Sequence, residues 1–217
     1  MPDLLGGLAY TWPYYAAIPV CYLIGSIPFG LIVARVAGLG DIRRIGSGNI
    51  GATNVLRTGH TALALLTLAL DLGKGTAAVA AAGFYGPDFE YIAGLSVVLG
   101  HMFPVWLRFQ GGKGVATAFG VLFAVSWPVA LAAGAGFAIV AAATRIVSVA
   151  SMIAMIAAPA MLWAMLALQR QETLPYWLPG LPQHVDLMAV IAVLVLVRHH
   201  ANIRRLMSGK EPRIGKA

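Results

Sequence analysis

The sequence predicts an all-α integral membrane protein that forms a single domain over residues 1–217. Of its 217 residues 59% are hydrophobic and only 11% are charged, whereas soluble domains carry roughly 25% charged residues. A soluble protein of this size could not hide so much apolar surface, so lipid must surround most of the chain. Because lipid cannot satisfy bare backbone groups, we expect the apolar stretches to be helical.

Seven apolar stretches are interpreted as membrane-spanning helices, since a helix needs about 20 apolar residues to cross the hydrocarbon core. The expected spans are residues 14–36, 61–84, 91–107, 115–127, 128–144, 147–168 and 185–201. The division between the fourth and fifth spans depends on a turn at residues 126–128, because Pro128 suits the start of a helix better than its interior. Without that turn, one long helix would replace two and the number of spans would fall to six.

The distribution of Lys and Arg predicts the orientation of these spans. One set of loops and span ends holds 13 of the 15 basic residues, the opposite set holds only Arg170, and Lys74 lies inside a span. The 13 residues are Arg35, Arg43, Arg44, Arg57, Arg108, Lys113, Arg145, Arg198, Arg204, Arg205, Lys210, Arg213 and Lys216. Because basic loops stay in the cytoplasm, we expect the N-terminus outside and the C-terminus in the cytoplasm. This arrangement requires an odd number of spans, and seven satisfies it.

The first segment that suggests chemistry, residues 46–57, has the sequence GSGNIGATNVLR. Three glycines in six positions let the backbone turn tightly and point its N–H groups into a concave nest that suits an anion. The side chains of Ser47, Asn49, Thr53 and Asn54 add further polar groups, and Arg57 adds a planar fork suited to phosphate. An ordinary Gly-Ser loop is the alternative, but the density of phosphate-binding groups favours an anion site.

Two further segments of this kind lie on the same predicted side. Residues 110–117, QGGKGVAT, place Lys113 between glycines at the start of a helix, where free N–H groups and the helix dipole attract phosphate. Residues 198–206, RHHANIRRL, leave the last span, and His199 and Asn202 share one helix face. A basic stop signal with incidental histidines explains this last segment equally well.

Polar residues within the predicted spans have structural and functional interpretations. Asp71 and Lys74 are three residues apart in an apolar helix, and their mutual pairing is the simplest account of two costly buried charges. A structural role and a direct role are both open for this pair. Ser148 and Ser151 lie near the predicted cytoplasmic face, where helix packing by small residues would also explain them. His101 is interpreted as a structural histidine near the membrane interface, with a role as a base as the alternative.

Several other classes of site are disfavoured by missing patterns. Neither His60 nor His101 has the aspartate five residues later that many glycerolipid acyltransferases use as a His-Asp base pair. Only eight Asp and Glu are present, and most lie on the predicted outer side, so a metal-dependent phosphotransferase is disfavoured. No Cys and His spacing is typical of a metal site. A transporter of phosphorylated solutes remains the leading alternative class, although no internal repeat is visible.

Taken together, these segments resemble the bacterial acyl-phosphate:glycerol-3-phosphate acyltransferases over nearly the whole chain. The resemblance rests on residues 25–30 (GSIPFG), 46–57, 71–75 (DLGKG), 100–101, 112–114 and 198–202. It implies a seven-span enzyme of the bacterial inner membrane whose site faces the cytoplasm. It also implies that no metal, no cofactor and no acyl-enzyme intermediate is needed. The expected partners are acyl phosphate, glycerol 3-phosphate and membrane lipid, with no nucleic acid, and we expect a monomer.

The resemblance assigns functional positions to Ser47, Arg57, Lys113, His199 and Asn202, together with a serine near 148–151. We therefore expect catalytic roles for Ser47, Lys113, His199 and Asn202. We expect substrate-binding roles for Gly46, Gly48, Asn49, Gly51, Thr53, Asn54, Arg57, Gly112, Gly114, Ser148, Ser151 and Arg198.

Within this site the glycine-rich loop is assigned to the acyl-phosphate head. Lys113 is placed between the two phosphates, and Arg57, His199 and Asn202 are assigned to glycerol 3-phosphate. The base that removes the hydroxyl proton is either His199 or a substrate phosphate, and the choice between Ser148 and Ser151 is also open.

Overall fold

The computed structural model describes residues 8–46 and 48–215, and every regular element in these ranges is helical. In chain order the elements are α1 (Leu8–Ser26), α2 (Phe29–Val36), the 3-10 helix η1 (Ile42–Arg44), α3 (Ala52–Leu56), α4 (Thr61–Gly83), α5 (Pro87–Met102), the 3-10 helix η2 (Val105–Leu107), α6 (Val115–Val125), α7 (Trp127–Thr144), α8 (Val147–Arg170), α9 (Pro182–Arg198) and α10 (His200–Met207). The all-α prediction is therefore confirmed for the described residues.

Five segments of the described chain are long and apolar enough to cross a membrane: Thr11–Val36, Thr61–Gly83, Pro87–Leu107, Trp127–Thr144 and Val147–Arg170. A sixth candidate is the pair α9 and α10, which is bent by 58°. The remaining predicted span is α6, whose 11 residues extend only about 16 Å at 1.5 Å per residue, short of the bilayer core. The structure thus supports five or six apolar spans, with α6 as a shorter apolar helix between them.

Proline decides two breaks in this helical pattern. The turn predicted at residues 126–128 is present, since α6 ends at Val125 and α7 begins at Trp127 with Pro128 in its first turn. The first predicted span is also interrupted, because α1 ends at Ser26 and α2 begins at Phe29 after Pro28. In both places the ring of proline fixes the backbone at a helix start and removes one N–H donor.

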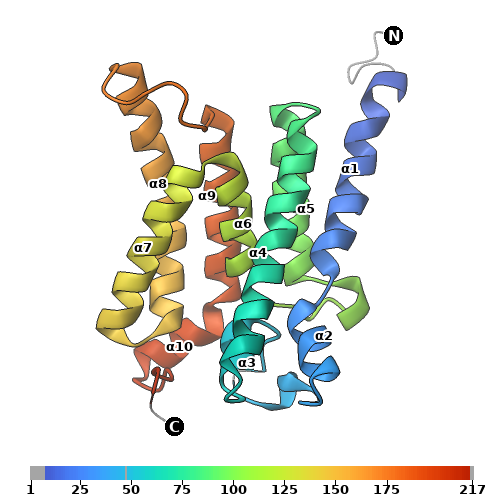
Figure 1. The fold of residues 1–217 in the computed structure, drawn as a ribbon, viewed down its shortest axis with the longest axis vertical. Helices are drawn as coiled ribbons and strands as arrows, with labels where there is room; N and C mark the ends of the chain where they lie inside the picture. Colours follow the sequence, from blue (N-terminus) through green and yellow to red (C-terminus); the bar gives the residue numbers. More distant parts are fainter. Residues whose placement is uncertain (1–7, 47, 216–217) are drawn as a thin grey trace.

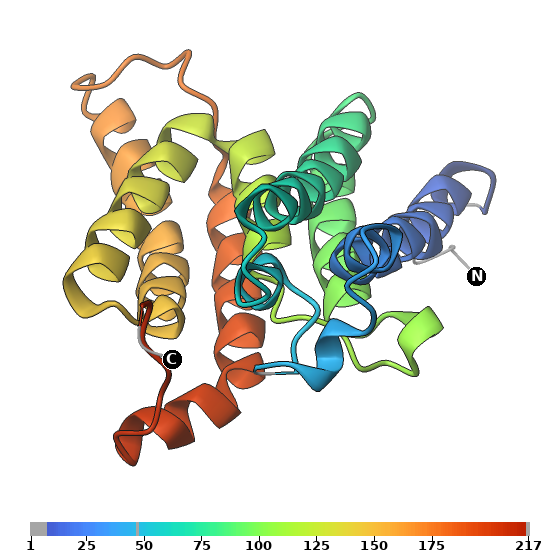
Figure 2. The ribbon, with the colours of Figure 1, turned by 60° about the horizontal axis from the view of Figure 1, so that its bottom comes forward.

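The long helices run roughly alongside one another, and the short elements gather at one end (Figure 1). Helix α1 packs against α5, α4 against α6, and α8 against both α7 and α9. Helices α2, α3 and α10 lie together at the lower end in this view, and turning that end forward brings them to the front (Figure 2). The described parts of the three segments predicted to form the site, residues 46–57, 110–117 and 198–206, all lie toward this end.

Glycines let two pairs of helices approach backbone to backbone. A side chain at Gly25 would meet the Val97 carbonyl, so α1 and α5 touch there. In the same way, a side chain at Gly120 would meet the carbonyl of Leu72, and this contact joins α6 to α4. Such close approach is typical of helix packing in membranes. It fixes the middle of α6 beside α4, and with it the position of the loop that precedes α6.

The buried charges of α4 form a paired cluster. The Lys74 ammonium lies 2.8 Å from the Asp71 carboxylate, and both side chains are almost fully buried. The ammonium also donates to the carbonyl of Ile27 at 2.9 Å, at the break between α1 and α2. The same carboxylate lies 3.4 Å from Nδ1 of His101 on α5. The predicted Asp71–Lys74 pairing is therefore confirmed, and the cluster links α4 to α5 and to the break between α1 and α2.

Candidate active site

A cavity of about 850 Å³ opens at the end of the molecule where the short elements gather. Its polar wall combines α3, the loop before α6, the first turn of α8 and the junction of α9 with α10. Among its lining residues are Asn49, Gly51, Thr53, Asn54, Arg57, Lys113, Gly114, Ser148, Ser151, His199 and Asn202. Eleven of the sequence-predicted site residues are thus brought to one cavity, although they come from segments up to about 150 residues apart.

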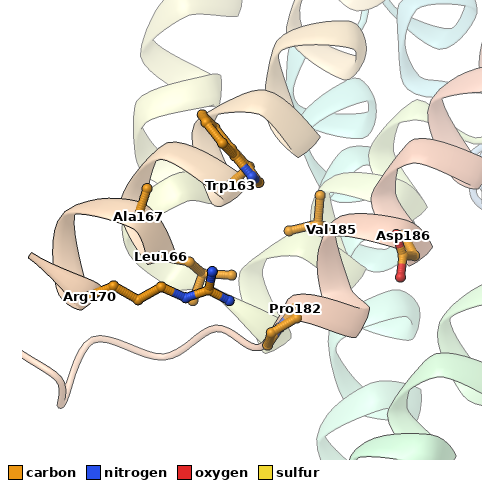
Figure 3. A pocket seen from close by; sticks show the side chains of 7 residues that line it. All are labelled: Trp163, Leu166, Ala167, Arg170, Pro182, Val185 and Asp186. Carbon is orange, nitrogen blue, oxygen red and sulfur yellow. The ribbon is translucent and has the colours of Figure 1, made fainter.

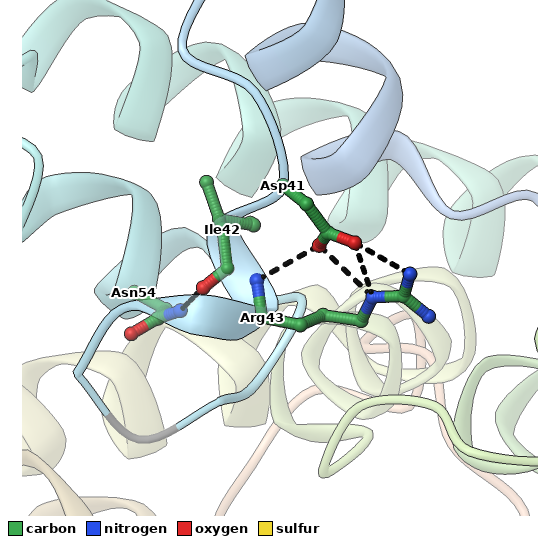
Figure 4. A network of polar contacts seen from close by, with 4 residues as sticks. All are labelled: Asp41, Ile42, Arg43 and Asn54. Atoms are coloured by element: carbon green, nitrogen blue, oxygen red, sulfur yellow. Dashed lines mark hydrogen bonds and ion pairs between the residues drawn. The ribbon is translucent and has the colours of Figure 1, made fainter.

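The first loop, residues 38–57, is held largely by its own side chains (Figure 4). The carboxylate of Asp41 accepts a 3.0 Å hydrogen bond from the backbone N–H of Arg43 and pairs with the Arg43 guanidinium. These contacts hold the pKa of Asp41 well below its usual range. The amide of buried Asn54 donates to the carbonyl of Ile42 at 2.7 Å, which ties α3 to η1.

Gly46 leaves room for the Arg57 side chain to pack over this loop. Its φ of +59° is left-handed, a conformation that glycine adopts without steric cost. A side chain there would lie 2.6 Å from the Asn54 amide oxygen and 2.8 Å from Cδ of Arg57. Gly46 therefore packs behind these two groups, and it is not among the described residues that line the cavity. Arg57 lines the cavity and is exposed, so its guanidinium is available to an anion.

Lys113 enters the cavity from the strap, which we define as residues 108–114 between η2 and α6. Gly114 adopts a left-handed φ of +81° directly before α6. Burial of Lys113 lowers the pKa of its ammonium to about 8, with help from the charges of Arg205, Arg57 and Arg198 and against the opposing charge of Glu211. A partly desolvated cation among other cations is suited to a site that binds anions.

His199 lies fully inside the site at the end of α9 and is 1% exposed. Its Nδ1 is 2.8 Å from the carbonyl of Val195, so Nδ1 carries a proton and donates it to that oxygen. In the neutral imidazole the lone pair is then on Nε2. The geometry leaves Nε2 as the ring nitrogen available to accept a proton or a hydrogen bond.

The C-terminal segment, residues 209–215, closes one side of the cavity, and the sequence analysis did not predict this. The Glu211 carboxylate accepts hydrogen bonds from Ser148 Oγ at 2.7 Å and from the Asn202 amide. It also pairs with Arg205 at 2.7 Å. Burial by itself would raise the pKa of Glu211, but the hydrogen bonds from these three residues outweigh it and lower the pKa.

These contacts separate the two candidate serines. Ser148 joins the Glu211 network, whereas the Ser151 hydroxyl donates to the carbonyl of Val147 in its own helix. Both serines line the cavity. In the sequence, Glu211 is a single carboxylate among the basic residues of the C-terminal segment. Those basic residues served only to predict the orientation in the membrane, so nothing pointed to a role for Glu211 in the site.

The remaining predicted site residues have other places. Ser47 lies outside the described residues. Gly48, Gly112 and Arg198, like Gly46, are absent from the described lining of the cavity. Asp71, for which a structural and a direct role were both open, and His101, which was interpreted as structural, do line it.

The rest of the cavity wall is apolar and extends between helices. Leu65 and Leu68 of α4 face it together with Phe119 of α6 and Phe137 of α7. The two phenylalanine rings meet edge to face at 6.2 Å. One cavity thus joins a cationic end to an apolar wall, which suits a ligand with an anionic head and a hydrocarbon tail.

A second hollow of about 300 Å³ lies at the opposite end of the molecule, between α8 and α9 (Figure 3). Its walls are mainly apolar, with Arg170 and Asp186 as its charged residues. None of the predicted site residues that the structure describes line it. In the described part of the chain, no group of three or more His, Cys, Asp or Glu is placed to hold a metal ion.

Comparison with known proteins identifies the family. The family model described as glycerol-3-phosphate acyltransferase matches residues 15–209. This chain belongs to the glycerol-3-phosphate acyltransferase family. It is 50% identical over 194 residues to the glycerol-3-phosphate acyltransferase of Brucella anthropi, covering 89% of this chain and 90% of that protein. The corresponding protein of Paramagnetospirillum magneticum is 51% identical over 195 residues, covering 89% and 90%.

Solved structures give the same family and the same fold. The crystal structure of PlsY, an integral membrane glycerol 3-phosphate acyltransferase, in its glycerol 3-phosphate form has a TM-score of 0.82 at 38% identity, covering 94% of this chain and 96% of that one. The lysophosphatidic acid form has a TM-score of 0.81 with the same identity and coverage. The resemblance noted from the sequence is therefore confirmed, and the chain is an integral membrane acyltransferase of the glycerol-3-phosphate acyltransferase family.

Proposed function

We propose that this acyltransferase moves a fatty acyl group from acyl phosphate to glycerol 3-phosphate, giving lysophosphatidate and phosphate. The observation that carries the proposal is the single cavity that gathers Arg57, Lys113, His199 and Asn202 at one end of an apolar wall. Both substrates are anionic, and one of them has a hydrocarbon tail. A cavity lined by the cations Arg57, Lys113 and Arg213 and by an apolar wall fits this pair. The relatives are glycerol-3-phosphate acyltransferases, which supports glycerol 3-phosphate as the acceptor. The structure of one relative in its lysophosphatidic acid form supports lysophosphatidate as the product.

In the proposed mechanism the site holds two phosphates side by side. Lys113 lies between them, the first loop binds the acyl-phosphate head, and Arg57 and Asn202 bind glycerol 3-phosphate. Holding the acceptor hydroxyl against the acyl carbonyl can supply about 7–11 kcal/mol of the barrier. The fatty tail would extend along Leu68 and Phe137 toward the lipid.

The chemical step forms an ester C–O bond and breaks the C–O bond to the leaving phosphate. The hydroxyl proton passes either to Nε2 of His199 or to a phosphate oxygen of a substrate. The hydrogen bond from Nδ1 to Val195 prepares Nε2 for this role. The developing oxyanion needs positive groups nearby, and the Lys113 ammonium is the cation in the best place. A His199→Gln enzyme that keeps substantial kcat with a raised KM for glycerol 3-phosphate would assign His199 to binding.

We further propose seven spans in the bacterial inner membrane, with the N-terminus outside, the cavity facing the cytoplasm, and a monomer as the active form. The distribution of Lys and Arg supports this orientation, which needs an odd number of spans, so the short apolar helix α6 is counted as the fourth span and α7 as the fifth. Single cysteines at Glu172 and Lys210, introduced into a Cys21→Ser background, test it. A membrane-impermeant thiol reagent added to intact cells should label the first position only. Labelling of position 210 from outside would contradict the orientation.

The site is tested with purified protein in detergent, acyl phosphate and labelled glycerol 3-phosphate. We expect Lys113→Ala and Ser47→Ala to lose about 10³-fold in kcat/KM while still folding. Lys210→Ala, which removes an exposed cation of the C-terminal segment, is the control and should keep the wild-type rate. Wild-type rates in both site variants would refute the proposed site.

A further inference from the structure

The strap that carries Lys113 is fixed on one side by the end of α5. The backbone N–H of Gly111 donates to the carbonyl of Met102 at 3.1 Å, and that of Gly112 donates to the carbonyl of His101 at 3.0 Å. A side chain at Gly112 would collide with Nε2 of His101. The imidazole therefore lies directly against the strap, and the N–H groups of both glycines are satisfied.

The carbonyls of the same two glycines are bound from the other side by one arginine. Arg198 donates from Nη2 to Gly111 at 2.9 Å and from Nε to Gly112 at 3.2 Å. Its guanidinium also lies 5.1 Å from the centre of the Phe103 ring, within the range of a cation–π contact. A planar fork can bind two successive carbonyls at once, whereas a lysine ammonium has no such fixed geometry.

Arg198 is also the residue before His199, which lines the cavity. One end of α9 therefore presents His199 to the cavity and Arg198 to the strap. Asn202, one helical turn further on, also lines the cavity. The strap that carries Lys113 is thus fastened to the segment that carries the other two groups, across 86 and 87 residues of sequence.

We propose that Arg198 is a positioning residue: by binding the Gly111 and Gly112 carbonyls it sets Lys113 opposite His199 and Asn202, without touching substrate itself. This inference rests on the proposed function of Lys113. The basic segment 198–206 had suggested a phosphate ligand or a simple topology signal at this position. A phosphate ligand would face the cavity, and a topology signal would need no partner. The side chain instead lies behind the cavity wall, partly buried and hydrogen-bonded to backbone.

The charges around Lys113 provide a readout that a general loss of stability would not move. Arg57 of the first loop, Arg198 of α9, Arg205 of α10 and Glu211 of the C-terminal segment act on its ammonium, and His199 lies close enough to feel its charge. Burial lowers the pKa of Lys113 to about 8. If the ammonium form is required, activity falls as pH rises through about 8. A loosened strap exposes Lys113, and Arg198→Gln also removes one neighbouring positive charge, so this alkaline fall should move to higher pH.

The test compares Arg198→Gln and Arg198→Lys with Arg204→Gln, an exposed cation on α10. We measure kcat, KM for glycerol 3-phosphate and the pH profile in detergent. Both Arg198 variants should lose about 100-fold in kcat, the cost of a misplacement of about 1 Å in a catalytic group. Both should shift the alkaline fall upward, and Arg204→Gln should do neither. Arg198→Lys keeps the charge, so it carries the test if Arg198→Gln does not fold.

Other outcomes overturn the proposal in recognisable ways. Recovery of activity by Arg198→Lys, with only the KM for glycerol 3-phosphate raised, would assign Arg198 to phosphate binding. Wild-type kcat and pH profile in both Arg198 variants would leave it a topology signal. If Lys113→Ala is also active, the proposed site itself fails. If Lys113→Ala is inactive while the Arg198 variants are normal, only the positioning role is refuted.

Discussion

Two loops carry the groups that we propose to bind phosphate in this acyltransferase, and they are held in different ways. The first loop, residues 38–57, is held from within: Asp41 caps η1, and Asn54 bonds to Ile42 only 12 residues away. The strap, residues 108–114, has partners on α5 and, 86 to 87 residues later, on α9. The polar contacts that shape the first loop are therefore local, whereas those that shape the strap form only once α9 is packed in place.

This difference predicts how each loop fails. Loss of the bonds that hold the first loop should appear mainly as lost stability, because these bonds close the loop on itself. Damage to the strap should appear mainly as lost rate, because its bonds set the distance between Lys113 and the groups across the cavity. Three substitutions separate these two behaviours, in order of decreasing effect.

The largest effect is expected from Gly112→Ala. The added methyl group would collide with the His101 imidazole, so the strap must shift away from α5. We expect about a 100-fold loss of kcat/KM, measured as lysophosphatidate formation. Gly73→Ala is the matched control, because a methyl group there meets nothing within 4 Å. Equal activity in the two variants would show that the strap tolerates displacement.

An intermediate effect, on stability and not primarily on rate, is expected from Asn54→Ala. The substitution leaves the buried Ile42 carbonyl without the amide that binds it, which costs about 1–3 kcal/mol. Thermal unfolding in detergent should show a lower midpoint than for the wild type. Because Asn54 also lines the cavity, some loss of rate will accompany it. An unchanged midpoint would contradict the idea that the first loop is closed by this bond.

The smallest effect is expected from Asp41→Asn. The Asp41–Arg43 pair is partly exposed to solvent, and surface pairs contribute about 0–1 kcal/mol. Asparagine can still accept the hydrogen bond from the Arg43 backbone at the start of η1. We expect the unfolding midpoint and the rate to stay within error of the wild type. A tenfold loss of activity would show that the local pair also positions the site.

The sequence by itself determined the helical membrane fold, because hydrophobicity and proline placement are properties of a single segment. The spans at residues 61–84 and 147–168 and the turn before Pro128 needed no knowledge of neighbours. The donor-rich segments were visible for the same reason, since glycines, polar side chains and a cation stand together within 46–57 and 110–117.

Tertiary structure decided which of these groups face the cavity and which hold it together. Arg198 binds the strap, Glu211 joins Ser148 to Asn202, and Gly46 packs behind Arg57. Each of these roles depends on how side chains meet after helices have packed, across as many as 87 residues. The chemistry of a side chain such as Arg198 allows it to bind either an anion or a backbone carbonyl. Which of these it binds depends on the groups that packing places beside it.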